Sequence, residues 1–99
     1  MSLDIPFQAL KIFLAVAETG SFTRAATRLN QPRYRVSRAV QQLEQVMGVQ
    51  LLHRTTRKTR LTEAGRYLFK QGQPLFTQLQ YTLQEVSALN QEIAGPLKI

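Results

Sequence analysis

The sequence predicts a mainly α-helical domain in which three helices and a small two-stranded hairpin are followed by one long helix. Three observations support this fold class. Apolar residues recur at intervals of three and four over 6–18, 22–29 and 32–47, which is helical spacing. After Gly48 the pattern changes to short β-compatible pieces, and helical spacing returns after Thr62. With 99 residues, 43% of them hydrophobic, the chain can form one small domain with a modest core.

Two short helices are predicted in the first third of the chain. The first, over 6–18, begins at Pro6, because the fixed φ of proline suits a first turn, and Gly20 ends it. Ser21 then offers a hydroxyl that can cap the second helix, at about 22–29. The second helix is short and built to pack closely, with four inward residues: Phe22, Ala25, Ala26 and Leu29.

The third helix is predicted to begin at Pro32 and to reach about Met47, where Gly48 ends it. At 100° per residue its apolar stripe consists of Val36, Val40, Leu43 and Met47. Its opposite side is polar and consists of Tyr34, Arg38, Gln41 and Gln45. Two helices joined by a tight turn, the second with an exposed polar face, form a helix-turn-helix pattern.

A small basic hairpin is predicted after the third helix. Residues 49–53 are apolar and β-compatible, 55–58 form a polar tip, and 59–61 form a second short extended piece. The basic side chains of this hairpin are Arg54, Arg57, Lys58 and Arg60. A basic hairpin beside a helix-turn-helix is a wing, so 1–61 is interpreted as a winged helix-turn-helix domain.

The last helix is predicted to begin at Thr62, whose hydroxyl caps it, and to reach about Glu92. We expect a bend at Pro74, because proline removes the hydrogen bond to the carbonyl four residues earlier. The Gly-Pro pair near the end of the chain is expected to break the helix. These signals assign 62–93 to a linker helix and 94–99 to a hinge and the start of a further C-terminal domain.

The second half of this helix carries an apolar stripe with coiled-coil spacing. The stripe consists of Phe76, Leu79, Leu83, Val86, Asn90 and Ile93. It can pack on its own domain or against a second chain. We favour a homodimer, because three turns that project beyond a compact head have nothing of their own to cover them. Asn90 either fixes the register of the pair or marks the end of the stripe.

The net charge of +7 is concentrated in the middle of the chain. Residues 24–70 hold eleven of the thirteen Lys and Arg and two of the six acidic residues, which gives this stretch a charge of +9. A positive field confined to one region indicates a polyanion as partner. A solvated basic surface is the alternative, and a membrane surface is a weaker one, because the charges do not line one helix face.

Catalysis, cofactor binding and metal binding are not expected. His53 is the sole histidine, the carboxylates are scattered, and cysteine and a phosphate-binding glycine loop are lacking. The lack of cysteine fits a reducing cytoplasm, and no apolar run approaches the ~18–20 residues that cross a bilayer, so we expect a cytoplasmic, nucleoid-associated protein. A winged adaptor without DNA binding and an RNA-binding module are alternatives. The basic face of the third helix disfavours the first, and the missing aromatic platform disfavours the second.

Three blocks in register resemble the N-terminal region of LysR-type transcriptional regulators. They read FLAVAETGSFTRAATRL (13–29), VSRAVQQLE (36–44) and GVQLLHRTTRKTRLTEAG (48–65), and the resemblance covers essentially the whole chain. It implies sequence-specific binding of double-stranded DNA by the recognition helix, 32–47, and a homodimer through the linker helix. For longer members it also implies tetramers and a C-terminal domain that binds a small-molecule effector.

The DNA-binding residues expected from this resemblance and from the helix faces lie at helix starts, on the recognition helix and on the wing. They are Ser21, Thr23, Arg24, Pro32, Arg33, Tyr34, Arg35, Ser37, Arg38, Gln41, Arg54, Arg57, Lys58 and Thr62. Where the family usually has Ser-Gln-Pro-Ala-Val-Ser, residues 32–37 read Pro-Arg-Tyr-Arg-Val-Ser. Arg33 and Arg35 can each bind a guanine edge or clamp a phosphate, and the sequence leaves both open. The wing is expected to add affinity at the backbone or the minor groove. Glu44 is expected to pair with an arginine of the same domain.

Overall fold

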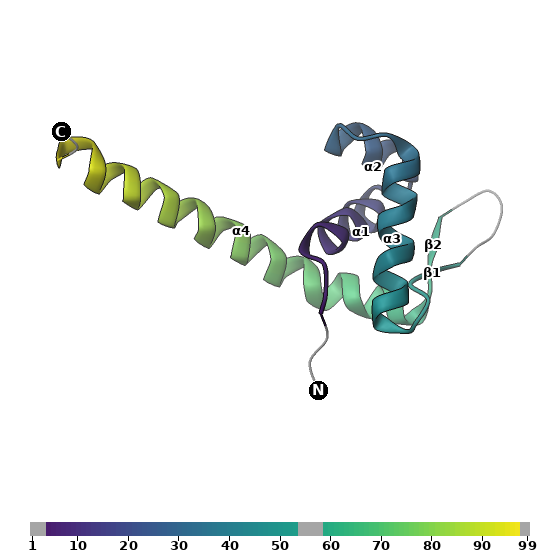
Figure 1. The fold of residues 1–99 in the computed structure, drawn as a ribbon. Coiled ribbons are helices and arrows are strands. Elements are labelled where there is room, and N and C mark those ends of the chain that lie inside the picture. The colour runs from purple at the N-terminus through teal and green to yellow at the C-terminus, as the bar shows by residue number, and fades with distance from the viewer. Residues whose placement is uncertain (1–3, 54–58, 98–99) are drawn as a thin grey trace.

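The computed structural model describes residues 4–53 and 59–97, and the side chains of residues 4–53 and 59–89. Three helices and a small hairpin form a head, from which one long helix projects (Figure 1). The elements are α1 (Phe7–Thr19), α2 (Phe22–Leu29), α3 (Arg33–Met47), β1 (Leu52–His53), β2 (Arg60–Leu61) and α4 (Glu63–Leu97). The predicted fold class, a winged helix-turn-helix followed by a long helix, is confirmed.

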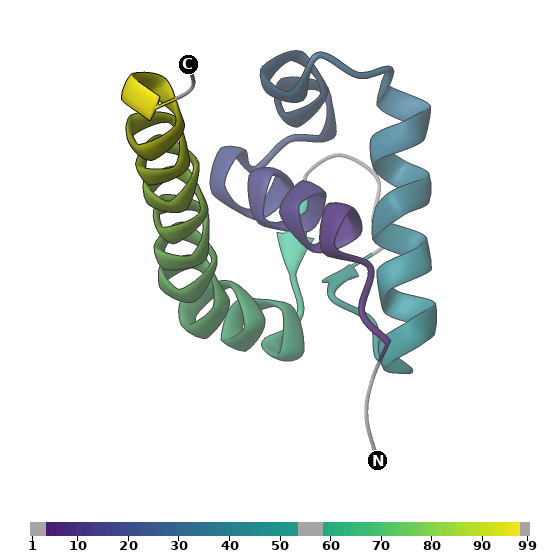
Figure 2. The same cartoon turned by 60° about the vertical axis from the view of Figure 1, so that its left-hand side comes forward.

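The helix α1 lies at the centre of the head, in contact with α2, α3 and α4 (Figure 2). One apolar cluster holds the head together. Its fully buried members include Phe13 and Val16 from α1 and Val36, Val40 and Leu43 from α3. The stripe predicted for the third helix is therefore its buried face. Burying each such side chain contributes about 1.5–3 kcal/mol, so this cluster supplies most of the driving force for folding.

The turns at the two ends of α2 set its place between α1 and α3. At its start the hydroxyl of Ser21 accepts a hydrogen bond of 3.1 Å from the backbone N–H of Arg24, which confirms the predicted cap. At its end Asn30 has a φ of 56°, a left-handed conformation that asparagine adopts at low cost. The N–H of Gln31 then donates to a carbonyl in the last turn of α2 at 3.0 Å. Pro32 caps α3 instead of being its first helical residue, so the predicted start is one residue early.

The wing is tied to α3 by a buried carboxylate. Glu44 of α3 accepts hydrogen bonds from the backbone N–H groups of Leu51, at 2.8 Å, and Leu52, at 3.1 Å. The first strand is shorter than the predicted 49–53, since β1 begins only at Leu52, and it pairs antiparallel with β2 through Leu52 and Leu61. The predicted tip of the hairpin lies outside the described residues, and the ion pair predicted for Glu44 stays a prediction.

The start of α4 lies directly against the segment that leads into β1. The hydroxyl of Thr62 accepts a hydrogen bond of 2.9 Å from the N–H of Gly65, which confirms the predicted cap. The backbone N–H of Thr62 donates to the carbonyl of Leu51 at 3.0 Å. A Cβ at position 65 would overlap that same carbonyl, so only glycine allows α4 to approach this closely.

The long helix α4 bends and is longer than predicted. Figure 2 shows a change of direction in its first half, where Pro74 lies, in agreement with the predicted bend. The predicted end at about Glu92 is wrong, because the helix continues to Leu97 with Gly95 and Pro96 inside it.

The first half of α4 belongs to the core of the head. Phe76 is 7% exposed, and its ring stacks on that of Phe7 in α1 with 4.9 Å between the centroids. The prediction placed Phe76 in a stripe between two chains, whereas in the structure its ring packs against Phe7 of the same chain. The spacing alone could not separate the two, because a helix shows the same period against either neighbour.

Candidate nucleic-acid interface

The predicted interface residues that the structure describes gather where α2 begins and where α3 begins. Most are exposed: Thr23, Arg24, Pro32, Arg33, Tyr34, Arg35, Arg38 and Gln41. Ser21 and Ser37 are half-buried. A hollow of about 610 Å³ between the two helices brings Thr23 together with Pro32 and Arg33. The polar start of the second helix and the first turn of the third therefore form one continuous surface.

The first turn of α3 presents three consecutive large polar side chains to solvent. Tyr34 is 61% exposed and stands between the exposed Arg33 and Arg35. The Cζ atom of Arg33 lies 5.7 Å from the centroid of the Phe22 ring, a cation–π distance. Within the described part of the chain, Arg35 and Arg38 have neither a ring contact nor an ion pair.

The charges on this side of the head are mostly not neutralised. Arg28 forms an ion pair of 2.9 Å with Glu18, and both side chains are half exposed, so this pair adds little stability. Among the described residues, no carboxylate forms an ion pair with Arg24 or with the arginines of α3. Four arginines with free guanidinium charges on two adjoining helices attract an anion with many charges, such as a phosphate backbone.

Thr62 has an internal role that the prediction of a DNA contact did not include. Its hydroxyl donates to the carbonyl of Gln50 at 2.7 Å, and its backbone N–H is bonded to Leu51. Both of its donors are therefore used inside the fold, where they join α4 to the segment before β1. Of the wing, Arg60 is exposed, whereas three predicted contacts lie outside the described residues: Arg54, Arg57 and Lys58.

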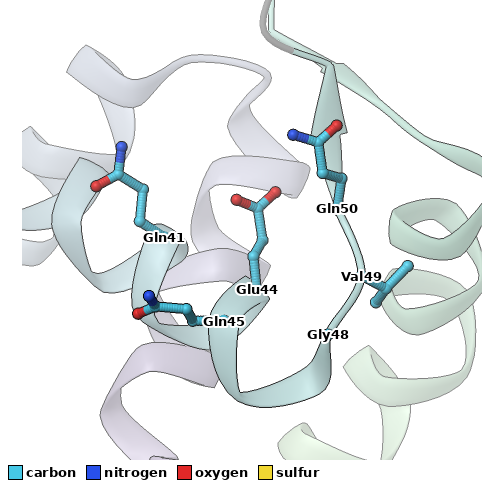
Figure 3. Close-up of a pocket in the computed structure, with 6 residues that line it drawn as sticks. All are labelled: Gln41, Glu44, Gln45, Gly48, Val49 and Gln50. Atoms are coloured by element: carbon cyan, nitrogen blue, oxygen red, sulfur yellow. The ribbon is translucent and has the colours of Figure 1, made fainter.

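A second hollow, of about 480 Å³, lies between the C-terminal half of α3 and the chain that leads into β1. Figure 3 shows the amides of Gln41, Gln45 and Gln50 around it, with the carboxylate of Glu44 between α3 and that chain. These amides offer both donors and acceptors on the side of α3 that continues from Arg38. The hollow extends the polar face of the recognition helix toward the wing.

The sequence did not predict that Phe22 and Gln50 contribute to this surface. Phe22 was predicted as an inward residue, and it also lies under Arg33. Gln50 was assigned to a strand, and it lines the hollow beside Gln41. No linear signal marks either contact, because each depends on how two elements cross in space.

Comparison with known proteins assigns the chain to a family. A family described as "Bacterial regulatory helix-turn-helix protein, lysR family" matches residues 7–66, which include all three helices of the head, the wing and the start of α4. The chain belongs to the LysR family. This family is one of bacterial transcription regulators and not of enzymes.

Relatives in the LysR family match nearly the whole chain. The regulator CrgA of Neisseria meningitidis is 38% identical over 92 residues, 93% of this chain and 31% of its own length. The solved structure of a CbnR_DBD–DNA complex has a TM-score of 0.75 at 32% identity, and covers 87% of this chain and 99% of that one. The complex of BenM_DBD with benA site 1 DNA has a TM-score of 0.71 at 30% identity, covering 91% and 97%. The chain spans about a third of the length of curated LysR relatives.

The stripe predicted for dimerisation is exposed beyond the head. Leu79 is 43% exposed, Leu83 53% and Val86 57%, whereas the side chains of Asn90 and Ile93 lie outside those described. In the described part of this LysR chain, no helix has the length and apolar character to cross a bilayer. No cluster of three possible metal ligands occurs in that part either.

Proposed function

We propose that this LysR-family head binds duplex DNA by inserting the N-terminal end of α3 into the major groove, with α2 and the wing on the flanking backbone. One observation carries the proposal: Arg33, Tyr34 and Arg35 project from the first turn of α3 beside the exposed start of α2. In helix-turn-helix proteins this end of the recognition helix meets the base edges. The similarity to domains solved in complex with DNA supports it. A regulator that acts on a bacterial chromosome works in the cytoplasm, and we include that location in the proposal.

A salt titration tests the electrostatic part. If a dimer neutralises about eight phosphates, the logarithm of the association constant should fall with the logarithm of the salt concentration at a slope near −7. The measurement is fluorescence anisotropy with a labelled duplex at several salt concentrations. Arg38→Ala should make the slope shallower by about one unit for each phosphate that the variant no longer neutralises. Lys70→Ala removes one charge from the exposed surface of α4 and is the matched control. A wild-type slope shallower than about −2 would contradict the proposal.

We propose further that two chains pair through α4. The exposed stripe is continuous with an apolar hollow of about 320 Å³ between α1 and α4, lined by Phe7, Leu10, Leu68, Gly72, Leu75, Phe76 and Leu79. Apolar surface of this kind on a projecting helix is stabilised when a second copy covers it. A dimer also matches the repeated half-sites that helix-turn-helix dimers bind.

Sedimentation equilibrium of matched variants tests the pairing. Leu83→Asp places a charge in the stripe and should shift the chain to monomer with unchanged helix content. Gln84→Asp places the same charge on the next exposed residue, outside the stripe, and should leave the dimer intact. Equal association constants for the two variants would show that the stripe is not the interface.

A further inference from the structure

The contact between Arg33 and Phe22 joins the first residue of α3 to the first residue of α2. The Phe22 ring is half-buried and packs against the core of the head, so its position is fixed by the fold. Arg33 is exposed, with its guanidinium carbon 5.7 Å from the centre of that ring. A flexible, solvent-exposed side chain thus has a rigid aromatic ring within cation–π distance.

Such a support restricts the direction of an arginine without using its hydrogen-bond donors. The guanidinium is planar, it stacks on aromatic rings through its face, and its five N–H donors lie in its plane. An arginine held over a ring therefore keeps the two-pronged edge that matches O6 and N7 of guanine. It also loses less rotamer freedom when it binds, because part of that freedom is already lost in the free protein.

The direction of Arg33 matters more for a base than for a phosphate. A phosphate is a compact charge that a cation can approach from many directions, whereas a bidentate bond to a guanine edge requires both donors to lie in the plane of the base. Arg33 also occupies the first position of the helix end that enters the groove in the proposed complex. Arg35, two residues along, is rotated by about 200° around the helix axis, so the two arginines point to different sides.

We propose that Arg33 reads a G·C pair in the major groove and that Phe22 is the positioning residue that aims it; this rests on the proposed binding of duplex DNA. The two residues together set one position of the sequence preference. The other basic side chains of the surface supply affinity that depends little on sequence.

Selection from a randomised duplex library by the 99-residue chain and its variants tests the proposal. The wild type should select guanine at one fixed position of each half-site. Arg33→Leu removes the donors that bind the guanine edge, so the preference at that position should fall by about 5- to 150-fold while the rest of the motif persists. Arg66→Leu makes the same replacement on the exposed surface of α4 and should leave the selected motif unchanged.

Variants of Phe22 separate positioning from packing. Phe22→Leu retains an apolar side chain without a ring, and should lower the guanine preference at that position about two- to fivefold in competition titrations. Phe22→Tyr keeps the ring and should restore the preference. Thermal denaturation monitors folding, and Phe22→Met provides a second ringless variant if the leucine variant unfolds.

Three results would overturn the proposal while leaving DNA binding intact. The first is an unchanged motif for Arg33→Leu with unchanged affinity, and the second is an unchanged motif with a uniform loss of affinity for every duplex, which indicates a phosphate clamp. The third is a guanine preference in folded Phe22→Leu or Phe22→Met equal to that of the wild type. A wild-type chain that selects no sequence and binds duplexes without salt dependence would instead refute the proposed function itself.

Discussion

The glycines of α4 give a prediction in which two physical effects oppose each other. In a helix interior, replacing glycine by alanine normally stabilises by about 1 kcal/mol, because alanine has the higher helix propensity. At Gly72 this gain should be realised, since a Cβ would meet only Leu68 Cδ1 at 3.5 Å, an ordinary contact. At Gly65 the Cβ would overlap the carbonyl of Leu51, which also accepts the hydrogen bond from Thr62. Relieving this overlap costs ~1–3 kcal/mol, and losing the hydrogen bond costs about 1 kcal/mol more.

The two substitutions should therefore move the melting temperature in opposite directions. Gly65→Ala has a net cost of about 2 kcal/mol, and at about 4–8 °C per kcal/mol for a domain of this size Tm should fall by roughly 8–16 °C. Gly72→Ala should raise Tm by roughly 4–8 °C. Circular dichroism at 222 nm measures both, at one chain concentration, because the proposed pairing would make Tm depend on concentration. A Tm for Gly65→Ala at or above that of the wild type would refute the close approach of α4 to the backbone of Leu51.

Further substitutions test the turn, the wing and the start of α2. Asn30→Gly should keep Tm within about 4 °C of the wild type. Asn30→Ala should lower Tm by roughly 4–8 °C, because a left-handed φ costs alanine about 1 kcal/mol. Equal effects of the two substitutions on Tm would contradict the left-handed conformation of residue 30. Glu44→Ala should lower the free energy of unfolding by about 2–6 kcal/mol, because it leaves the buried N–H groups of Leu51 and Leu52 without their acceptor. Urea denaturation measures this change. A decrease below about 1 kcal/mol would refute the role of Glu44 in anchoring the wing. Ser21→Asp should leave Tm unchanged, because aspartate also caps a helix. It should weaken DNA binding, because its negative charge repels phosphate. An unchanged affinity for DNA at low salt would show that Ser21 lies away from the DNA.

Local signals predicted the helices and their caps, because those features depend on residues a few positions apart. The apolar stripe of α3, the Ser21 cap and the Thr62 cap all follow from spacing within one or two turns. The contacts that define the surface join residues distant in sequence. Arg33 meets Phe22 only because α2 and α3 cross at that point, and Phe76 is buried only because α4 returns along α1. A periodic pattern shows which face of a helix is apolar, but not what covers it.

The segment just before β1 links α3, the proposed recognition helix, to α4, the proposed pairing helix. At Leu51 the backbone N–H is bonded to Glu44 of α3, and the carbonyl accepts the N–H of Thr62 at the start of α4. A second bond joins the Thr62 hydroxyl to the carbonyl of Gln50. Because Gly65 removes the side chain that would separate α4 from this segment, these short contacts fix the angle between the two helices. In the proposed dimer that angle sets the distance between the two recognition helices. A substitution at Leu51 or Gly65 that leaves the chain folded should therefore alter the preferred spacing of the half-sites. The bases read in each half-site should not change.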